Sequence, residues 1–170
     1  MLKNITELLN NNIPNKFYIS GIYALNITNN DEDSFGDWHR NIWYNINEYP
    51  NSNITHFGDL GEFNTNDIWD SYGIYEGKGL LLKENNIITN YKNIYIANHR
   101  RAVLDLLYYY IKKYKVIWEV GEAAEEYILD NKKIIEMLDK SKYVVKYLNN
   151  DELFIYNKWY LKQEKYLMGE

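Results

Sequence analysis

Residues 98–114 read NHRRAVLDLLYYYIKKY. Apolar side chains recur in this stretch at spacings of three and four, the period of a helix that turns one face to a core. They are Val103, Leu104, Leu107, Ile111 and Tyr114. Asn98 suits the N-cap, because its side-chain oxygen can accept a hydrogen bond from an amide of the first turn. The stretch therefore predicts a helix over residues 98–114, the strongest in the chain.

Two more helices are expected on the C-terminal side. Residues 131–148 should form one, capped by Asp130 or Asn131 and ended by the asparagines that follow. Its apolar stripe consists of Ile134, Ile135, Leu138, Val145 and Leu148. Asp151 begins the last helix, whose inward residues are Leu153, Tyr156, Tyr160 and Leu167. The C-terminal half is thus predicted to be helical.

The N-terminal half carries strand signals instead. Apolar residues alternate over residues 17–27, which is the period of a half-buried strand. Residues 42–49 and 54–57 flank a run of turn formers and predict a hairpin beside that strand. The remaining expected elements are a small hairpin from residues 80–82 and 87–88, and short helices at residues 4–9 and 66–72.

Strands first and helices last predict an α+β fold, in which a small antiparallel sheet from the N-terminal half packs against helices of the C-terminal half. A chain of 170 residues with 46% hydrophobic and 25% charged residues suits one domain with one core. No repeat or linker divides it. We therefore expect a single domain over residues 1–170.

Composition excludes several classes of protein. The chain has no cysteine, so it has neither a disulfide framework nor a thiolate metal site. Residues 1–9 do not read as a signal peptide, and no apolar run is long enough to span a membrane, so a cytoplasmic protein is expected. A net charge of −5 disfavours a broad nucleic-acid-binding surface.

Tyrosine is unusually abundant, with 18 residues. One interpretation is a tyrosine-rich binding surface, since this side chain gives a large contact area at a low entropy cost. The other is coding bias, because Asn, Ile and Lys are also frequent while Ala and Pro are scarce. Composition alone does not separate the two.

The common catalytic motifs are absent, which leaves three histidine clusters as candidates. In the first, His39 could act as a general base oriented by Asp37, while Arg40 clamps an anion beside Trp38. The same residues also suit a turn in which Asp37 accepts backbone amides and Trp38 covers the sheet edge.

The second cluster, at the start of the strongest helix, contains His99, Arg100, Arg101 and Asp105. Helix amides and two arginines could hold an anion there. The simpler interpretation is an ion pair between Arg101 and Asp105 on the helix surface, next to a half-buried His99. If two clusters share a pocket, Asp37 and His39 should meet His99 and Arg100, as the catalytic residues of an enzyme.

The third cluster is His56, Asp59 and Glu62, an oxygen-rich set that could hold a hard divalent cation. Two or three such residues on a loop are common by chance, so a surface loop is the preferred interpretation. We predict no metal site and no cofactor.

Three stretches carry a resemblance: residues 17–23, which read FYISGIY, residues 36–39, which read GDWH, and residues 97–107, which read ANHRRAVLDLL. In these the chain resembles small uncharacterised bacterial proteins from mobile or toxin–antitoxin-like loci. The resemblance implies a bacterial or phage origin and transfers no activity.

Two functions follow as hypotheses. The first is a regulatory or inhibitory protein-binding module whose partner is another protein, such as a bacterial toxin or a defence enzyme. It rests on the missing enzyme motifs, the tyrosines and the resemblance. The second is a small metal-independent nuclease or phosphoester-processing enzyme that uses the His, Arg and Asp clusters. Self-association as a homo-oligomer stays open in both.

Overall fold

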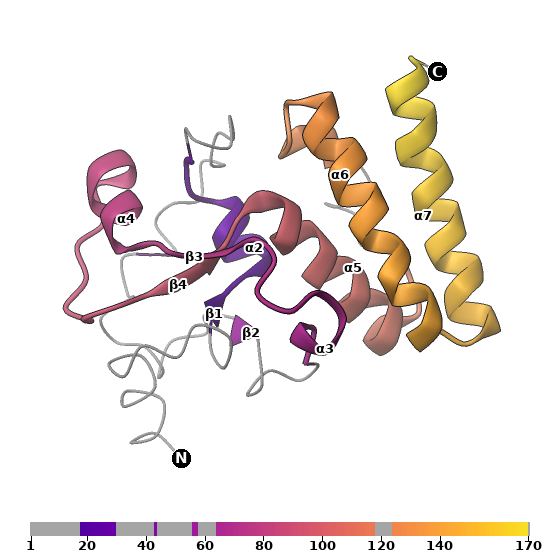
Figure 1. The fold of residues 1–170 in the computed structure, drawn as a ribbon, viewed down its shortest axis with the longest axis horizontal. Coiled ribbons are helices and arrows are strands. Elements are labelled where there is room, and N and C mark those ends of the chain that lie inside the picture. The colour runs from indigo at the N-terminus through magenta and orange to yellow at the C-terminus, as the bar shows by residue number, and fades with distance from the viewer. Residues whose placement is uncertain (1–17, 30–42, 44–55, 58–63, 118–123, 170) are drawn as a thin grey trace.

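Figure 1 shows the fold in a computed structural model, which describes residues 18–29, 43, 56–57, 64–117 and 124–169. In this part of the chain a small sheet lies toward one end and long helices lie toward the other. The elements are β1 (Tyr18–Ile19), α2 (Gly21–Leu25), β2 (His56–Phe57), α3 (Asn66–Trp69), β3 (Ile74–Glu76), α4 (Lys78–Asn85), β4 (Tyr95–Ala97), α5 (His99–Tyr114), η5 (Ala124–Glu126), α6 (Asn131–Ser141), η6 (Lys142–Tyr147) and α7 (Asn150–Met168).

The sheet has the strand order β2-β1-β4-β3 within the described residues. Pairing is antiparallel for β1 with β2 and for β3 with β4, but β1 and β4 run parallel, with Ile19 opposite Ile96. The α+β prediction is therefore confirmed, and the sheet is mixed rather than antiparallel. A parallel pair requires a long crossover, which the many residues between β1 and β4 supply.

The strand predicted over residues 17–27 is wrong beyond Ile19. The backbone turns at Gly21, whose φ of 63° favours glycine, and α2 follows. Ala24 and Leu25 are buried while Ile22 is 42% exposed, so burial follows a helical period. Apolar residues alternate along the sequence here, but burial in the structure does not alternate from residue to residue.

The small hairpin predicted from residues 80–82 and 87–88 is also wrong, because residues 78–85 form α4. Asn86 ends the helix in the left-handed conformation, with φ of 57°. The buried Asn85 side chain accepts from the Thr28 amide at 2.7 Å and donates to the Thr28 carbonyl at 3.0 Å. These bonds hold the end of α4 against the segment that follows α2.

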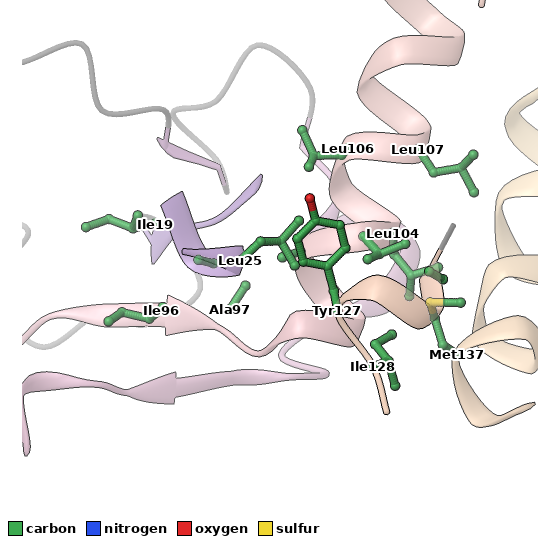
Figure 2. Packing of buried hydrophobic residues seen from close by; sticks show 14 of the residues in the cluster. Ile19, Leu25, Ile96, Ala97, Leu104, Leu106, Leu107, Tyr127, Ile128 and Met137 are labelled. Carbon is green, nitrogen blue, oxygen red and sulfur yellow. The ribbon is translucent and has the colours of Figure 1, made fainter. Parts of the chain in front are cut away.

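Helix α5 confirms the prediction for residues 98–114. The Asn98 side chain accepts from the Arg101 amide at 2.9 Å, and the helix ends before Lys115. It packs against α2, β4, α6 and α7, which makes it the central element of the described fold. Figure 2 shows the core around it, where Leu104 of α5 lies near Leu25 of α2, Met137 of α6, and Tyr127 and Ile128 of the segment after η5.

The sequence predicts the positions of the C-terminal helices correctly, but it predicts less well which of their side chains face the core. Helix α6 ends at Ser141 and continues as the 3-10 helix η6. Ile135 and Val145, predicted inward, are exposed, and Met137 and Val144 are buried instead. Helix α7 has a capping box at Asn149, and its buried residues are Glu152, Tyr156, Trp159 and Gln163. Only Tyr156 of its four predicted inward residues is fully buried.

Several predictions lie wholly or partly outside the described residues. The helix at residues 4–9 and most of the hairpin over residues 42–57 belong here, although β2 does pair beside β1.

The helix predicted at residues 66–72 is shorter, ending at Trp69 with Thr65 as N-cap. None of the helices in the described ranges is long and apolar enough to cross a membrane.

Candidate functional site

The polar centre of the molecule is an ion pair between Arg101 and Asp105 of α5. The two side chains are 0% exposed, and Arg101 Nε donates to Asp105 Oδ1 at 2.9 Å. The four-residue spacing was predicted to give a pair on the helix surface, and that placement is wrong. Residues of β1 and of the 64–72 segment cover this face of α5, so the pair lies in the interior.

The guanidinium of Arg101 uses all five of its N–H donors. Besides the bond to Asp105, Nη1 donates to the carbonyls of Asp70 at 2.9 Å and Tyr72 at 3.0 Å. The Nη2 group donates to Tyr18 Oη at 2.7 Å and to Asn66 Oδ1 at 2.6 Å. Burial lowers the pKa of Arg101, but the charge of Asp105, the neighbouring Tyr18 and the hydrogen bonds to both side chains together outweigh burial, so the pKa is raised. The cation is therefore satisfied within the fold.

The Asp105 carboxylate is equally well satisfied. Its oxygens accept from the hydroxyls of Tyr18 at 2.9 Å, Ser20 at 2.7 Å and Thr65 at 2.6 Å, in addition to Arg101. Burial, and next the charge of Asp105, hold the pKa of Tyr18 well above its ordinary value. The network joins β1, the start of α3 and α5, so its hydrogen bonds hold these three elements together.

His99 is 2% exposed rather than half-buried. Its Nδ1 lies 2.9 Å from the Tyr127 carbonyl oxygen and its Nε2 lies 3.0 Å from that of Ile27. A carbonyl oxygen only accepts, so a neutral imidazole can donate to one of the two and an imidazolium to both. The ring thereby links the end of α2 to the segment after η5.

Arg100 points away from that interior. Its Nη1 forms an ion pair with Glu136 of α6, and its guanidinium lies 5.9 Å from the ring centroid of Tyr72. Of the two candidate catalytic residues of α5, His99 thus makes buried polar contacts and Arg100 pairs with α6.

The other half of the predicted enzyme site lies outside the described residues. This applies to Asp37, Trp38, His39 and Arg40, so their meeting with His99 and Arg100 stays a prediction. The same holds for Asp59 and Glu62 of the third cluster. Within the described ranges, no group of three or more metal-ligating side chains comes together.

A different candidate site lies on the outer face of α7. Phe154, Leu161 and Met168 follow one another at intervals of seven residues and are 73%, 56% and 66% exposed. They lie on the side of the helix opposite buried Tyr156 and Trp159, and we call them the outer stripe. In Figure 1, α7 is the outermost helix at its end of the molecule. The seven-residue spacing of the outer stripe is visible in the sequence, whereas the sequence prediction for this helix names only its inward residues.

The chain matches none of the family models, curated proteins or solved structures with which it was compared.

Proposed function

We propose that the chain is a regulatory or inhibitory protein-binding module that docks through the outer stripe of α7. A bacterial toxin or a defence enzyme is the class of partner that we propose, in line with the resemblance to proteins of mobile and toxin–antitoxin-like loci. The proposal rests on one observation, the exposure of three large apolar side chains along one line of a long helix.

The geometry of the stripe suits recognition of a helix by a groove. Single exposed apolar residues are normal on protein surfaces, whereas an aligned set has the form of an interaction site. The stripe from Phe154 to Met168 is about 21 Å long at 1.5 Å per residue. Amphipathic helices that bind in apolar grooves present their anchors at such helical spacings.

The charges beside the stripe indicate the chemistry of the groove. Lys158 and Lys165 lie on the same exposed face, and neither makes an ion pair with another part of the described structure. Two lysines thus lie along the stripe in a chain whose net charge is −5. We therefore propose a partner whose apolar groove is edged by Asp and Glu side chains, which would guide docking and set its orientation.

The test uses two exposed leucines as a matched pair. Leu161 of the stripe is 56% exposed and Leu82 of α4, at the other end of the molecule, is 54% exposed. A partner is recovered from the bacterial host with the tagged chain, purified, and titrated by calorimetry. We expect Leu161→Asp to weaken its binding by at least tenfold, as loss of a central anchor does, and Leu82→Asp to leave it unchanged.

Four results would contradict the proposal. Equal effects of the two leucine variants would remove the stripe from the interface. A dimer of this chain alone that Leu161→Asp dissociates would make a second copy the partner, and binding to anionic vesicles that the same variant abolishes would make it a membrane. Nucleic-acid cleavage that His39→Ala abolishes, with no protein partner recovered, would favour the enzyme hypothesis.

A further inference from the structure

A pocket of about 500 Å³ is lined by residues of β3, α4 and the segments beside them. In Figure 1 these elements lie at the sheet end of the molecule, far from α7. The walls of the pocket come from the segment after α2, the turn into β3, α4 and the N-cap of α5. The residues used below are Asn29, Glu76, Gly79, Lys83, Glu84 and Asn98. The volume is within the range of sites for small ligands, about 300–1,000 Å³.

One wall of the pocket holds a buried acceptor with nothing to bond to. Asn29 is 4% exposed, and its Oδ1 has no hydrogen-bond partner in the described structure. An unpaired buried polar atom costs free energy of folding, so proteins rarely keep one without a use for it. A ligand with an N–H group would supply the missing bond.

A second asparagine offers the complementary group. Asn98 is 6% exposed, and its Oδ1 is occupied by the Arg101 amide. Its Nδ2 makes no hydrogen bond with the described residues, which leaves an N–H donor on the same pocket. Asn29 and Asn98 together therefore present one acceptor and one donor.

The fold holds both asparagines in place. The Asn85 side chain bonds to the amide and carbonyl of Thr28, the neighbour of Asn29. The Asn98 amide donates to the Gly73 carbonyl at 2.7 Å, and a Cβ on Gly73 would lie only 2.6 Å from Asn98 Oδ1. A glycine with φ of 71° allows this close approach, so the Asn98 side chain is held against the turn at Gly73.

The charges around the pocket disfavour an anion. Glu76 and Glu84 bring two carboxylates and Lys83 brings one ammonium group. The described lining thus has one more negatively charged side chain than positively charged ones, which disfavours an anionic ligand. An uncharged ligand meets no such penalty.

We propose that this pocket binds an uncharged small molecule that carries an N–H donor beside a carbonyl or ring-nitrogen acceptor. This is the chemistry of a nucleobase edge and of a primary carboxamide. The ligand donates to Asn29 Oδ1 and accepts from Asn98 Nδ2, which completes both side chains at once. The site is separate from the outer stripe of α7 and does not depend on its function.

The test titrates the 170-residue chain with adenosine, guanosine, cytidine, uridine and nicotinamide, followed by NMR and calorimetry. At least one should bind with a Kd of about 1 mM or tighter. Binding of nucleosides alone identifies a nucleobase, and binding of nicotinamide alone identifies a carboxamide. Failure of all five, or a nucleoside 5′-monophosphate that binds more than tenfold tighter than its nucleoside, would overturn the proposal.

Variants show whether the asparagine carries the binding. Asn29→Leu should weaken the bound probe by at least tenfold and also raise Tm by about 2–4 °C, because it removes the unpaired oxygen. A merely structural asparagine would give a lower Tm. Asn157→Leu, the same change on the exposed face of α7, should leave the affinity unchanged.

A second variant tests the pocket without touching either asparagine. A Cβ at Gly79 would meet no atom within 4 Å, so Gly79→Leu should fold and reach into the pocket mouth. We expect it to weaken the bound probe by at least tenfold with no loss of Tm. Unchanged affinity in both Asn29→Leu and Gly79→Leu would show that the probe binds elsewhere and would refute the site.

Discussion

At the scale of single residues, the fold depends on charges that it buries completely. Removing Arg101 and Asp105 from water is costly, and their attraction offsets that cost only when every remaining donor and acceptor is satisfied. Here the guanidinium has six acceptors and the carboxylate has four donors. The pair therefore fixes where β1 and the 64–72 segment sit on α5.

Removing one charge of this pair should lower the stability of the fold strongly. Arg101→Met leaves a buried carboxylate without its cation, and we expect the free energy of unfolding to fall by about 3–5 kcal/mol. Asp105→Leu should cost a similar amount. The double variant should cost clearly less than the sum, since neither charge is then left alone. Urea unfolding of the three variants measures these differences.

The matched control is an exposed pair of similar spacing. Asp139 and Lys142 lie 2.7 Å apart, with side chains 66% and 53% exposed. Asp139→Asn should leave the urea midpoint almost unchanged, because solvent screens such pairs. Additive effects of Arg101→Met and Asp105→Leu would contradict the role assigned to the buried pair.

At the scale of helices, Glu152 joins the start of α7 to the end of α5. Its carboxylate accepts from Lys112 at 2.9 Å, from Lys115 and from the Asn149 amide at 2.9 Å. Burial raises the pKa of Glu152, but the hydrogen bonds from Lys115, Asn149 and Lys112 outweigh it and lower the pKa to about 2. The ionised form is thus the one that holds the two helices together.

This contact should make stability depend on acid pH. Because the folded pKa is lowered from 4.5 to about 2, the contribution is complete above pH 4.5 and is lost as the pH falls toward 2. We expect Glu152→Gln to cost about 1–2 kcal/mol at pH 7, reduced by the exposure of Lys115. Its difference from the unsubstituted chain should shrink as the pH falls from 4.5 and vanish below pH 2. A difference that stays constant from pH 7 to pH 2 in urea unfolding would contradict this.

Elements whose signals are local could be predicted from sequence. The cap and stripe of α5 act within one or two turns, as does the polar start of α7 predicted at Asp151. Both helices are placed correctly, although Asn149 caps α7 rather than ending the helix before it. Helices α2 and α4 are short, and their apolar runs fit a strand as well as a helix. What decides them is distant, such as the bonds between Asn85 and Thr28, 57 residues apart.

The candidate sites follow the same rule. The spacing of Arg101 and Asp105 was visible, but their burial depends on Tyr18 and Thr65, which lie 87 and 40 residues from Asp105. The outer stripe of α7 could have been found from its spacing. The pocket could not, because Asn29 and Asn98 are brought together only by the completed fold.

At the scale of the whole molecule, α5 connects the two proposed sites. Its N-cap is Asn98 of the pocket, and its last turn carries Lys112, which holds α7 through Glu152. The side chains between them, Ala102, Val103, Leu104 and Leu107, are buried. The two proposed sites thus have α5 as a common support.

If α5 is that support, its amides should open only when the whole described fold unfolds. Residues 102–107 are buried and packed between α2, β4, α6 and α7, whereas α4 buries only Leu81 and Asn85 among its eight residues. We expect hydrogen exchange of the α5 amides to be at least tenfold slower than that of the α4 amides, and to follow global unfolding as denaturant is added. Exchange of α5 through local opening, or faster than that of α4, would show that the centre of the molecule lies elsewhere and that the two sites are not joined through this helix.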